Sequence, residues 1–464
     1  MLSIVLLSIF GLLVLYLGFQ KSQSLLLPVT LLVLAVTLVA NFIHWNEIPS
    51  LYFKGMLYEN NLTMAFSGIV LLSALLIAAL TRGFQDDDTA QPAEYYAIML
   101  FSLVGALMMI GFENLIMLFV GVEILSVSMY VLTGSDKKNL RSNEAALKYF
   151  LMGAFATGIM LFGMAMLYGA TGSFNITALK SYVLTNAAPS TMLYIGMLML
   201  LIGMLFKVSA APFHFWTPDV YDGAPTIFTA FMSTIVKTAG FAAIYRLLSH
   251  SFSGMYDFWW VTMAAITILT LLAGNITAVY QQSFKRMMAF SSISHAGYLL
   301  LSLTALTSQS QDAIVFYSLA YSLATISAFG VLLVVSKEMA ISLPEKADNF
   351  DAFNGLAKKN PLLAFVLTVS MLSLAGIPLT AGFWGKFFVF SSVVERGLTW
   401  VLIVAVLMSA IGIYYYFRAL IAAYMREGEL AAIKIPPFYR FVLIATTVIT
   451  LFLGLLPDFL KGLV

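Results

Sequence analysis

Long apolar segments follow one another along almost the whole of this 464-residue chain. Fourteen of them reach the roughly 20 residues that a helix needs to cross the hydrocarbon core of a bilayer. Backbone N–H and C=O groups find no water there, so only helices or closed barrels span membranes, and segments this long favour helices. With 61% hydrophobic residues and only 10% charged ones, the sequence predicts an all-α integral membrane protein with about 14 transmembrane helices.

The limits of the expected helices follow from the apolar segments. They are 2–20, 24–43, 62–81, 94–112, 114–133, 143–169, 191–214, 225–248, 258–280, 287–306, 312–336, 361–391, 399–424 and 437–460. The twelfth is too long for one straight crossing and contains Gly376, Pro378, Gly382 and Gly385, so we expect a broken helix there.

The basic residues of the loops predict the orientation. Assigning the loops alternately to the two sides places fourteen Lys and Arg residues on one side and four on the other. Cytoplasmic loops carry the excess of basic residues, so both termini are expected on the opposite, outer side.

A second break is predicted where the seventh apolar segment runs into KVSAAPFHFWTPDVYDGAPT, beginning at Lys207. A lysine at the membrane centre costs roughly 2.5–3.5 kcal/mol on insertion scales, so it usually faces a polar interior and marks an ion or substrate path. Pro212 removes a backbone donor, and His214 shares a face with Lys207 in any helix that continues past that proline. We interpret this stretch as a broken helix that carries an ionisable lysine inside the membrane.

Few other charged residues lie within the expected spans. Those predicted to lie deep are Glu123, Lys148, Lys207, Lys237 and Lys386, with His295 central in the tenth span. We expect Arg246 and Arg418, nearer the span ends, to extend towards an interface.

These positions indicate an internal repeat. Spans five and seven carry Glu123 and Lys207 beside one break, and spans ten and twelve carry His295 and Lys386 beside the other. Because the offset of five spans is odd, matching segments enter the membrane in opposite directions, which predicts two inverted five-helix repeats. We expect N-terminal helices 1–3 in residues 1–93, the repeats in 94–250 and 251–425, and a last helix in 426–464.

Several function classes are excluded. The chain has no cysteine, which excludes disulfides, thiolate zinc sites and iron–sulfur ligation by this chain. It has no G-x-G-x-x-G motif and no carboxylates at chelating spacing around its histidines, so we expect no bound cofactor and no metal. A net charge of +2 without a long basic run gives no reason to expect nucleic acid as a partner.

Four passages resemble a known family. They are EAALKYFLMGAFATGIMLFGMAMLYGATGSF from Glu144, KVSAAPFHFWTPDVYDGAPT from Lys207, KRMMAFSSISHAGYLL from Lys285 and LAGIPLTAGFWGKF from Leu374. In these the chain is similar to the antiporter-like membrane subunits of bacterial NADH:quinone oxidoreductase, respiratory complex I. The chain is more similar to the subunit N group than to subunits M or L. It has Lys386 where subunit M typically has a glutamate, and its sequence ends soon after the last span, without the long lateral helix of subunit L.

The resemblance implies a proton-pumping module with a polar axis through the membrane. Glu123 resembles the family's helix-five glutamate, and Lys207, Lys237 and Lys386 resemble its lysines of helices seven, eight and twelve. Lys148, His214 and His295 match further axis positions, and Pro212 and Pro378 the helix breaks.

The resemblance also implies where the partners and cofactors lie. NADH, FMN, iron–sulfur clusters and quinone are expected in partner subunits. The expected neighbours are subunit M, subunits K and J and the lateral helix of subunit L, in a bacterial cytoplasmic (inner) membrane with both termini on the periplasmic or outer side.

Alternatives remain for the residues and for the function. The alternative interpretation of Lys148 is an interfacial anchor, and that of His214 is part of an aromatic belt. For Glu123 the alternative is a purely structural ion pair. If Glu123 and Lys207 form a switching pair, a change in the carboxylate's position or charge could make the lysine bind or release a proton. Two alternative functions remain. The chain is a stand-alone or multisubunit sodium/proton antiporter subunit, or it is a spacer that only couples its neighbours.

Overall fold

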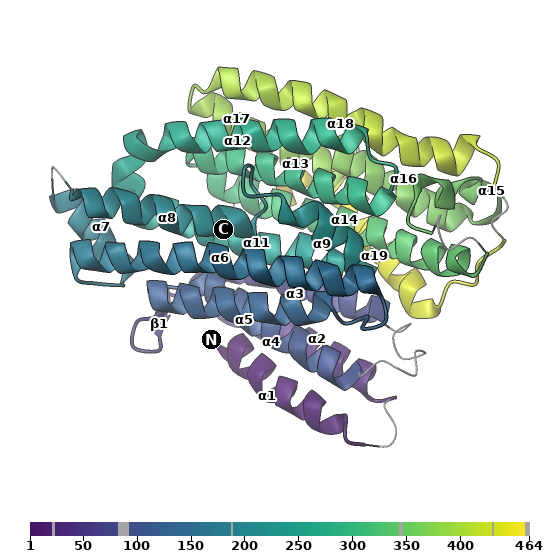
Figure 1. The fold of residues 1–464 in the computed structure, drawn as a ribbon, viewed down its shortest axis with the longest axis horizontal. Coiled ribbons are helices and arrows are strands. Elements are labelled where there is room, and N and C mark those ends of the chain that lie inside the picture. The colour runs from purple at the N-terminus through teal and green to yellow at the C-terminus, as the bar shows by residue number, and fades with distance from the viewer. Residues whose placement is uncertain (21–23, 82–91, 187–188, 343–346, 429–430, 460–464) are drawn as a thin grey trace. The chain divides into compact units, whose positions relative to one another are not determined.

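The structure, a computed structural model, describes the chain apart from residues 21–23, 82–91, 187–188, 343–346, 429–430 and 460–464. Almost every element is a helix, which confirms the all-α prediction (Figure 1). A helix lies in each of the fourteen expected segments. Among the described residues, nine helices are long and apolar enough to cross a membrane by length and composition. The number of crossings stays a prediction.

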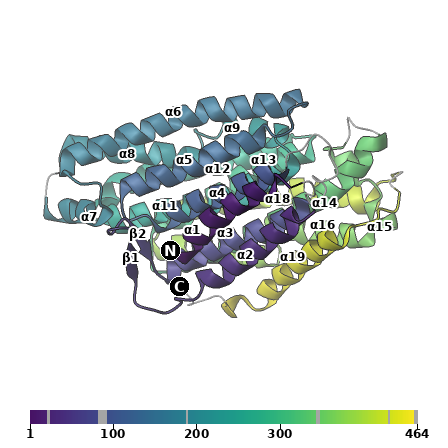
Figure 2. The same cartoon turned by 90° about the horizontal axis from the view of Figure 1, so that it is seen from below.

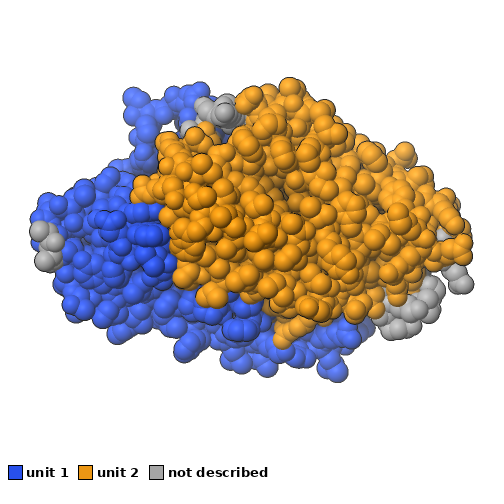
Figure 3. Space-filling view, turned by 90° about the horizontal axis from the view of Figure 1, so that it is seen from above, with its two compact units in different colours: residues 1–216, 235–263, 464 blue, residues 217–234, 264–463 orange. Residues whose placement is uncertain are grey.

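The helices belong to two compact units, coloured separately in Figure 3. Unit 1 consists of Met1–Trp216 and Ile235–Met263, and unit 2 of Thr217–Thr234 and Ala264–Leu463. The chain passes from one unit to the other within α9 (Trp216–Gly223), η2 (Met232–Val236) and α12 (Tyr256–Val279). These units are defined by internal packing and do not test the symmetry of a repeat. The expected repeat limits at residues 94, 251 and 426 therefore stay a prediction.

Unit 1 contains the first eight helices and a short hairpin. Its elements are α1 (Leu2–Leu17), α2 (Leu26–Asn41), β1 (Ser50–Tyr52), β2 (Leu57–Glu59), α3 (Asn61–Ala79), α4 (Pro92–Gly111), α5 (Leu115–Thr133), α6 (Leu140–Thr171), α7 (Ile176–Thr185), α8 (Thr191–Lys207), α11 (Lys237–Arg246), η3 (Leu247–Ser251) and η4 (Ser253–Met255). Strands β1 and β2 pair antiparallel, with Leu51 opposite Tyr58.

Glycines allow two helix pairs of unit 1 to pack closely. Helix α6 lies along α8 in both Figures 1 and 2, and a Cβ on Gly163 would stand 2.6 Å from the backbone nitrogen of Leu200. Helices α4 and α5 meet in the same way, where a Cβ on Gly105 would stand 2.6 Å from the carbonyl oxygen of Gly121. Small residues at helix contacts are typical of membrane proteins, where close backbone approach supplies the packing energy.

Unit 2 is also helical throughout the part that the structure describes. Its elements are α10 (Thr226–Phe231), α13 (Phe284–Ala305), α14 (Ser310–Ser342), η6 (Phe350–Phe353), α15 (Leu356–Lys359), α16 (Pro361–Ala375), α17 (Ala381–Glu395), α18 (Thr399–Met425), α19 (Pro437–Leu455) and η7 (Pro457–Phe459). Helix α14 packs against α16, α17 and α19, and α13 packs against α17.

Both predicted helix breaks are confirmed. The seventh segment ends as a helix at Lys207, and turns cover 208–215 before α9 begins. The prediction that this helix continues to His214, and so places His214 on the same face as Lys207, is therefore wrong. The twelfth segment divides into α16 and α17, and Gly376 ends α16 in a left-handed conformation with φ of 81° that glycine adopts easily.

Some local features had no sequence prediction. They include the hairpin, the surface helix α7 and two stretches of π-helix, η2 before Lys237 and η3 after Arg246. Of the loop basic residues, Lys285 and Arg286 lie in the first turn of α13, and Lys21, Arg82, Lys346 and Lys461 lie outside the described residues.

Candidate functional site

Lys207 is the last residue of α8 and is only 3% exposed. Its Nζ donates hydrogen bonds to Ser126 Oγ at 2.7 Å and to the Tyr130 hydroxyl at 3.4 Å, both on α5. The end of a helix carries partial negative charge from its unpaired carbonyls, which favours a cation there. The break after Lys207 therefore provides a buried place for an ammonium group.

Glu123 lies one turn before Ser126 on α5. Within the described part of the chain, no ion pair of 4.0 Å or less joins Glu123 to Lys207, and Glu123 Oε1 has no hydrogen-bond partner. The two groups are near enough to interact electrostatically. The structure therefore places the glutamate beside the lysine's site, with hydroxyl groups making the direct contacts.

Lys237 is the first residue of α11 and is 2% exposed. Gly240, three residues later, approaches Val208, since a Cβ on this glycine would lie 2.7 Å from Val208 Cγ1. The start of α11 thus packs against the residue that follows Lys207. Both lysines lie in one buried region of unit 1.

Lys386 lies beside the second break, in the second turn of α17. Its Nζ donates to the carbonyl of Ala375, the last residue of α16, and to Ser409 Oγ, each at 2.9 Å. The ammonium also lies 4.6 Å from the centre of the Tyr298 ring. The interruption of the twelfth helix leaves backbone carbonyls without the N–H partners that a continuous helix would supply. Lys386 donates a hydrogen bond to one of these carbonyls.

His295 lies within unit 2, 2% exposed, on α13. Its Nδ1 and Nε2 lie 2.7 Å from the Tyr317 hydroxyl and 2.9 Å from the Tyr416 hydroxyl. The edge of the Tyr298 ring approaches it with centroids 5.9 Å apart. Because Tyr298 also contacts Lys386, unit 2 brings His295 and Lys386 around the same tyrosine.

The two lysine sites share their chemistry. Lys207 and Lys386 each contact a serine hydroxyl and a tyrosine, and each lies beside a helix break. A hydroxyl accepts from a charged ammonium and donates to a neutral amine, so these partners suit either form of the lysine. A tight carboxylate partner would instead favour the charged form alone.

The remaining predicted residues lie apart from these sites. Lys148 pairs with Glu144 at 2.7 Å on the surface of α6, and 42% of its side chain is exposed. His214 lies in the turns after α8, where its ring centre is 4.6 Å from that of Phe215 and the two rings are tilted by 30°. Pro212 and Pro378 lie within the two breaks. These contacts fit the anchoring and aromatic alternatives for Lys148 and His214 and leave their roles untested.

Arg246 reaches a buried ion pair. Its guanidinium pairs with Glu113, which lies between the fourth and fifth expected spans. Arg418 instead donates to the carbonyls of Val279 and Gln281 at the end of α12. Backbone carbonyls freed at helix ends thus take up charges that the sequence alone assigned to an interface.

Sequence reasoning missed the polar residues that contact the lysines and the histidine. Ser126 and Tyr130 follow Glu123 by three and seven positions, so helical spacing could have placed them on its face. Tyr317 and Tyr416 come from other helices, and nothing in the local sequence connects them with His295.

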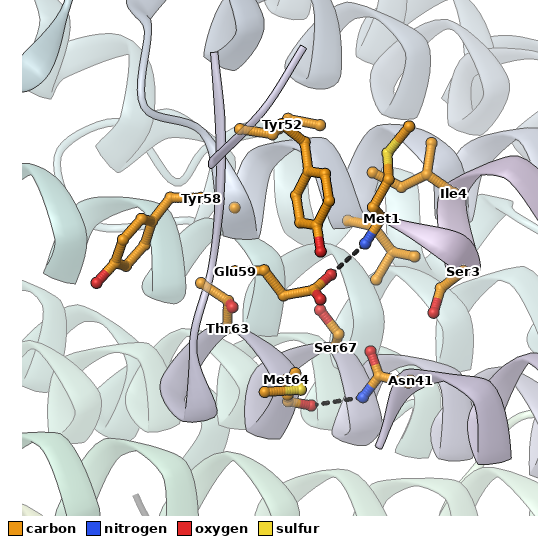
Figure 4. Close-up of a pocket in the computed structure, with 13 residues that line it drawn as sticks. Met1, Ser3, Ile4, Asn41, Tyr52, Tyr58, Glu59, Thr63, Met64 and Ser67 are labelled. Carbon is orange, nitrogen blue, oxygen red and sulfur yellow. Dashed lines mark hydrogen bonds and ion pairs between the residues drawn. The ribbon is translucent and has the colours of Figure 1, made fainter. Parts of the chain in front are cut away.

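A small cavity of about 40 Å³ lies elsewhere in unit 1 (Figure 4). Glu59 points towards Met1 within it, and Asn41, Tyr52 and Thr63 also line its wall. None of the described residues at the lysine sites lines this cavity. It has room for a few water molecules but is separate from the buried lysines.

Buried lysines at two broken membrane helices define an antiporter-like membrane protein, and the comparisons agree. Residues 113–412 match the family described as "NADH:quinone oxidoreductase/Mrp antiporter, TM", and the chain belongs to this family. A relative from Cytophaga hutchinsonii, named NADH-quinone oxidoreductase subunit N, is 41% identical over 461 residues, covering 99% of this chain and 98% of its own. Within the family, the chain belongs to this subunit N group.

Solved structures have the same fold. A chain of respiratory complex I from Thermus thermophilus with bound aureothin superposes with a TM-score of 0.85 at 34% identity, covering 99% of both chains. A chain of the Mrp complex from Dietzia sp. DQ12-45-1b superposes with a TM-score of 0.85 at 21% identity, covering 100% of this chain and 96% of that one. The second likeness concerns the fold alone.

Proposed function

We propose that this chain translocates protons in the membrane arm of an NADH:quinone oxidoreductase, through Glu123, Lys207, Lys237, His295 and Lys386. The redox chemistry takes place in other subunits, since this chain has no cysteine to ligate an iron–sulfur cluster. The enzymatic activity is that of the whole complex, a translocase, to which this chain contributes the membrane step.

The observation that carries the proposal is the environment of the two break lysines. Each is buried and contacts neutral partners that suit both protonation states, Ser126 and Tyr130 for Lys207, and Ser409 for Lys386. Burying an ammonium is costly, and a site that also accepts the neutral amine allows the proton to leave. A lysine with a purely structural role would gain more from a tight ion pair.

The mechanism follows from this chemistry. Lys207 takes up a proton while it donates to Ser126, and a change in the charge of nearby Glu123 alters how firmly that proton is held. Lys237, at the start of α11, is next along the path. By resemblance, the proton then passes by way of water and His295 to Lys386, and from the cytoplasm to the outer side.

The family supplies the finer assignments of this proposal. The neighbours are subunit M, subunits K and J and the lateral helix of subunit L, and the partner subunits hold FMN, iron–sulfur clusters and quinone. The membrane is the bacterial cytoplasmic membrane, with both chain termini on the outer side, as the loop charges indicate.

Lys386→Ala tests the proposal in the assembled complex. Protons pumped per NADH oxidised should fall, because the terminal proton carrier is lost. Lys358→Ala is the matched control, since this lysine of unit 2 has 69% of its side chain exposed and only a surface ion pair. Normal pumping by Lys386→Ala, with normal assembly, would remove Lys386 from the path.

Co-purification separates this function from a sodium/proton antiporter. The proposal predicts that the tagged chain isolates with an NADH-oxidising complex that contains flavin and iron–sulfur clusters. An antiporter subunit would instead exchange sodium for protons in vesicles without any such partner.

A further inference from the structure

A second polar cluster lies in unit 1, built from three segments far apart in the sequence. It contains Glu113 before α5, Thr177 on α7, Arg246 at the end of α11 and His250 in η3. The backbone of Glu113 also connects two elements, because its N–H donates to Met56 at 2.8 Å and its carbonyl accepts from Ile176 at 3.1 Å. The cluster thus lies where the hairpin, α7 and α11 meet.

Arg246 holds one side of the carboxylate. Its guanidinium lies 2.5 Å from Glu113 Oε2, donates through Nε to the Phe112 carbonyl at 2.6 Å, and stacks 4.5 Å from the centre of the Tyr58 ring. Glu113 is 6% exposed and Arg246 9%. Three contacts on a planar group leave little freedom, so Arg246 fixes the orientation of the carboxylate.

The other carboxylate oxygen connects to the surface. The Thr177 hydroxyl donates to Glu113 Oε1 at 2.5 Å, and His250 Nε2 lies 3.2 Å from Thr177 Oγ1. The side chain of His250 is 36% exposed, whereas that of Glu113 is 8% exposed. A hydroxyl both donates and accepts, so the three groups form a hydrogen-bonded row from the surface to a buried carboxylate.

We propose that Glu113, Thr177 and His250 form a proton-exchange site on the outer side of the chain, with Arg246 as its positioning residue. The proposal rests on the proposed function, whose loop-charge orientation places this end of unit 1 outside. An imidazolium at His250, protonated from the outer solution, passes its Nε2 proton to Thr177 Oγ1 while the Thr177 hydroxyl proton moves to Glu113 Oε1, the oxygen to which that hydroxyl donates. The imidazolium becomes an imidazole and the carboxylate an acid, and the same two transfers in reverse return the proton to the outer solution.

The site is connected to the lysine path through one helix. Helix α11 begins at Lys237 and ends at Arg246, nine residues and about 13.5 Å apart at 1.5 Å per residue. Stretches of π-helix, η2 and η3, flank α11 on both sides, and such stretches occur frequently at functional sites. Protonation of Glu113 weakens its ion pair with Arg246, so it acts on the same helix that carries Lys237.

Three charged groups face His250 and shape its response to pH. They are Glu113, Lys180 on α7 and Arg246 on α11. Histidine is the side chain that exchanges protons near neutral pH, so proton exchange through it should depend on the pH of the outer solution. The outer-pH dependence is therefore a readout that a merely structural ion pair would not affect.

Thr177→Val tests the relay in the assembled complex, because valine keeps the shape and removes the hydroxyl. Protons pumped per NADH oxidised should fall, because the hydroxyl that transfers the proton is lost. Thr177→Ser should pump nearly normally. Thr185→Val, an exposed threonine on the same helix, is the matched control and should have no effect.

His250→Gln tests the same proton-exchange site if the Thr177→Val complex does not assemble. It should assemble and lose the dependence of pumping on outer pH that a titrating histidine produces. Unchanged outer-pH dependence in His250→Gln, or normal pumping by Thr177→Val, would overturn the proposal. Failure of the proposed function would appear differently, as normal pumping by Lys386→Ala while these variants are impaired.

Discussion

The ion pair between Glu113 and Arg246 allows a quantitative prediction. Arg246→Met keeps much of the side-chain volume but removes the guanidinium that contacts Glu113, the Phe112 carbonyl and the Tyr58 ring. The carboxylate, 8% exposed, is then left without its counter-charge. Removing one partner of a buried pair typically costs about 3–5 kcal/mol. The lost stacking and carbonyl contacts lie within this figure, because contacts of one network are not additive.

Hydrogen exchange measures this cost where it arises. The backbone N–H groups of Glu113 and Ile176 bond to Met56 and to Glu113, so opening of the cluster exposes both. A loss of about 3–5 kcal/mol accelerates their exchange by about 10² to 10³·⁵, at 1.4 kcal/mol per factor of ten. Arg141→Met, which changes an exposed arginine of unit 1, should leave these rates nearly unchanged.

A double-mutant cycle completes this test. Glu113→Gln with Arg246→Met should cost less than the sum of the single changes by about 1–3 kcal/mol, since both break one interaction. Exchange in Arg246→Met that accelerates by less than about threefold would refute the reasoning, because the ion pair would then contribute no more than a surface pair.

Two further predictions concern topology and the second helix break. Cysteines introduced singly near Lys138 and near Lys461 should be labelled from opposite sides of the membrane, and labelling of both from one side would contradict the span count. Gly382→Ala should reduce assembly or pumping, because a Cβ there would lie 1.8 Å from the Ser373 carbonyl oxygen. Gly158→Ala is the control and should have no effect, since a Cβ at Gly158 would have no atom within 4 Å. Equal behaviour of the two variants would contradict the packing of α17 on α16.

The length and composition of the apolar segments predicted the helices because the bilayer imposes one solution on the backbone. Each expected apolar segment contains a helix, and the twelfth segment breaks at Gly376, within the stretch predicted to interrupt it. The end of α8 was the exception. The helix stops at Lys207, five residues before Pro212, so the proline lies within the break rather than at its start.

The residues around the site were predicted less well, for a physical reason. Lys207, Lys386 and His295 stand out because a titratable group in an apolar segment is costly. Ser409, Tyr317 and Tyr416 do not, since hydroxyl groups are common in membrane helices and their partners lie far along the chain. The same applies to Arg246, whose partner Glu113 precedes it by 133 positions.

Lys207→Arg in the assembled complex tests the central claim most directly. Arginine keeps the positive charge at the end of α8 but does not release a proton at any working pH. The measurement is the number of protons pumped per NADH oxidised, with assembly checked by the yield of the intact complex. A lysine that carries the proton predicts that Lys207→Arg pumps almost as poorly as Lys207→Met. Normal pumping by Lys207→Arg in a fully assembled complex would mean that Lys207 holds a fixed charge, and the proposed path would be wrong.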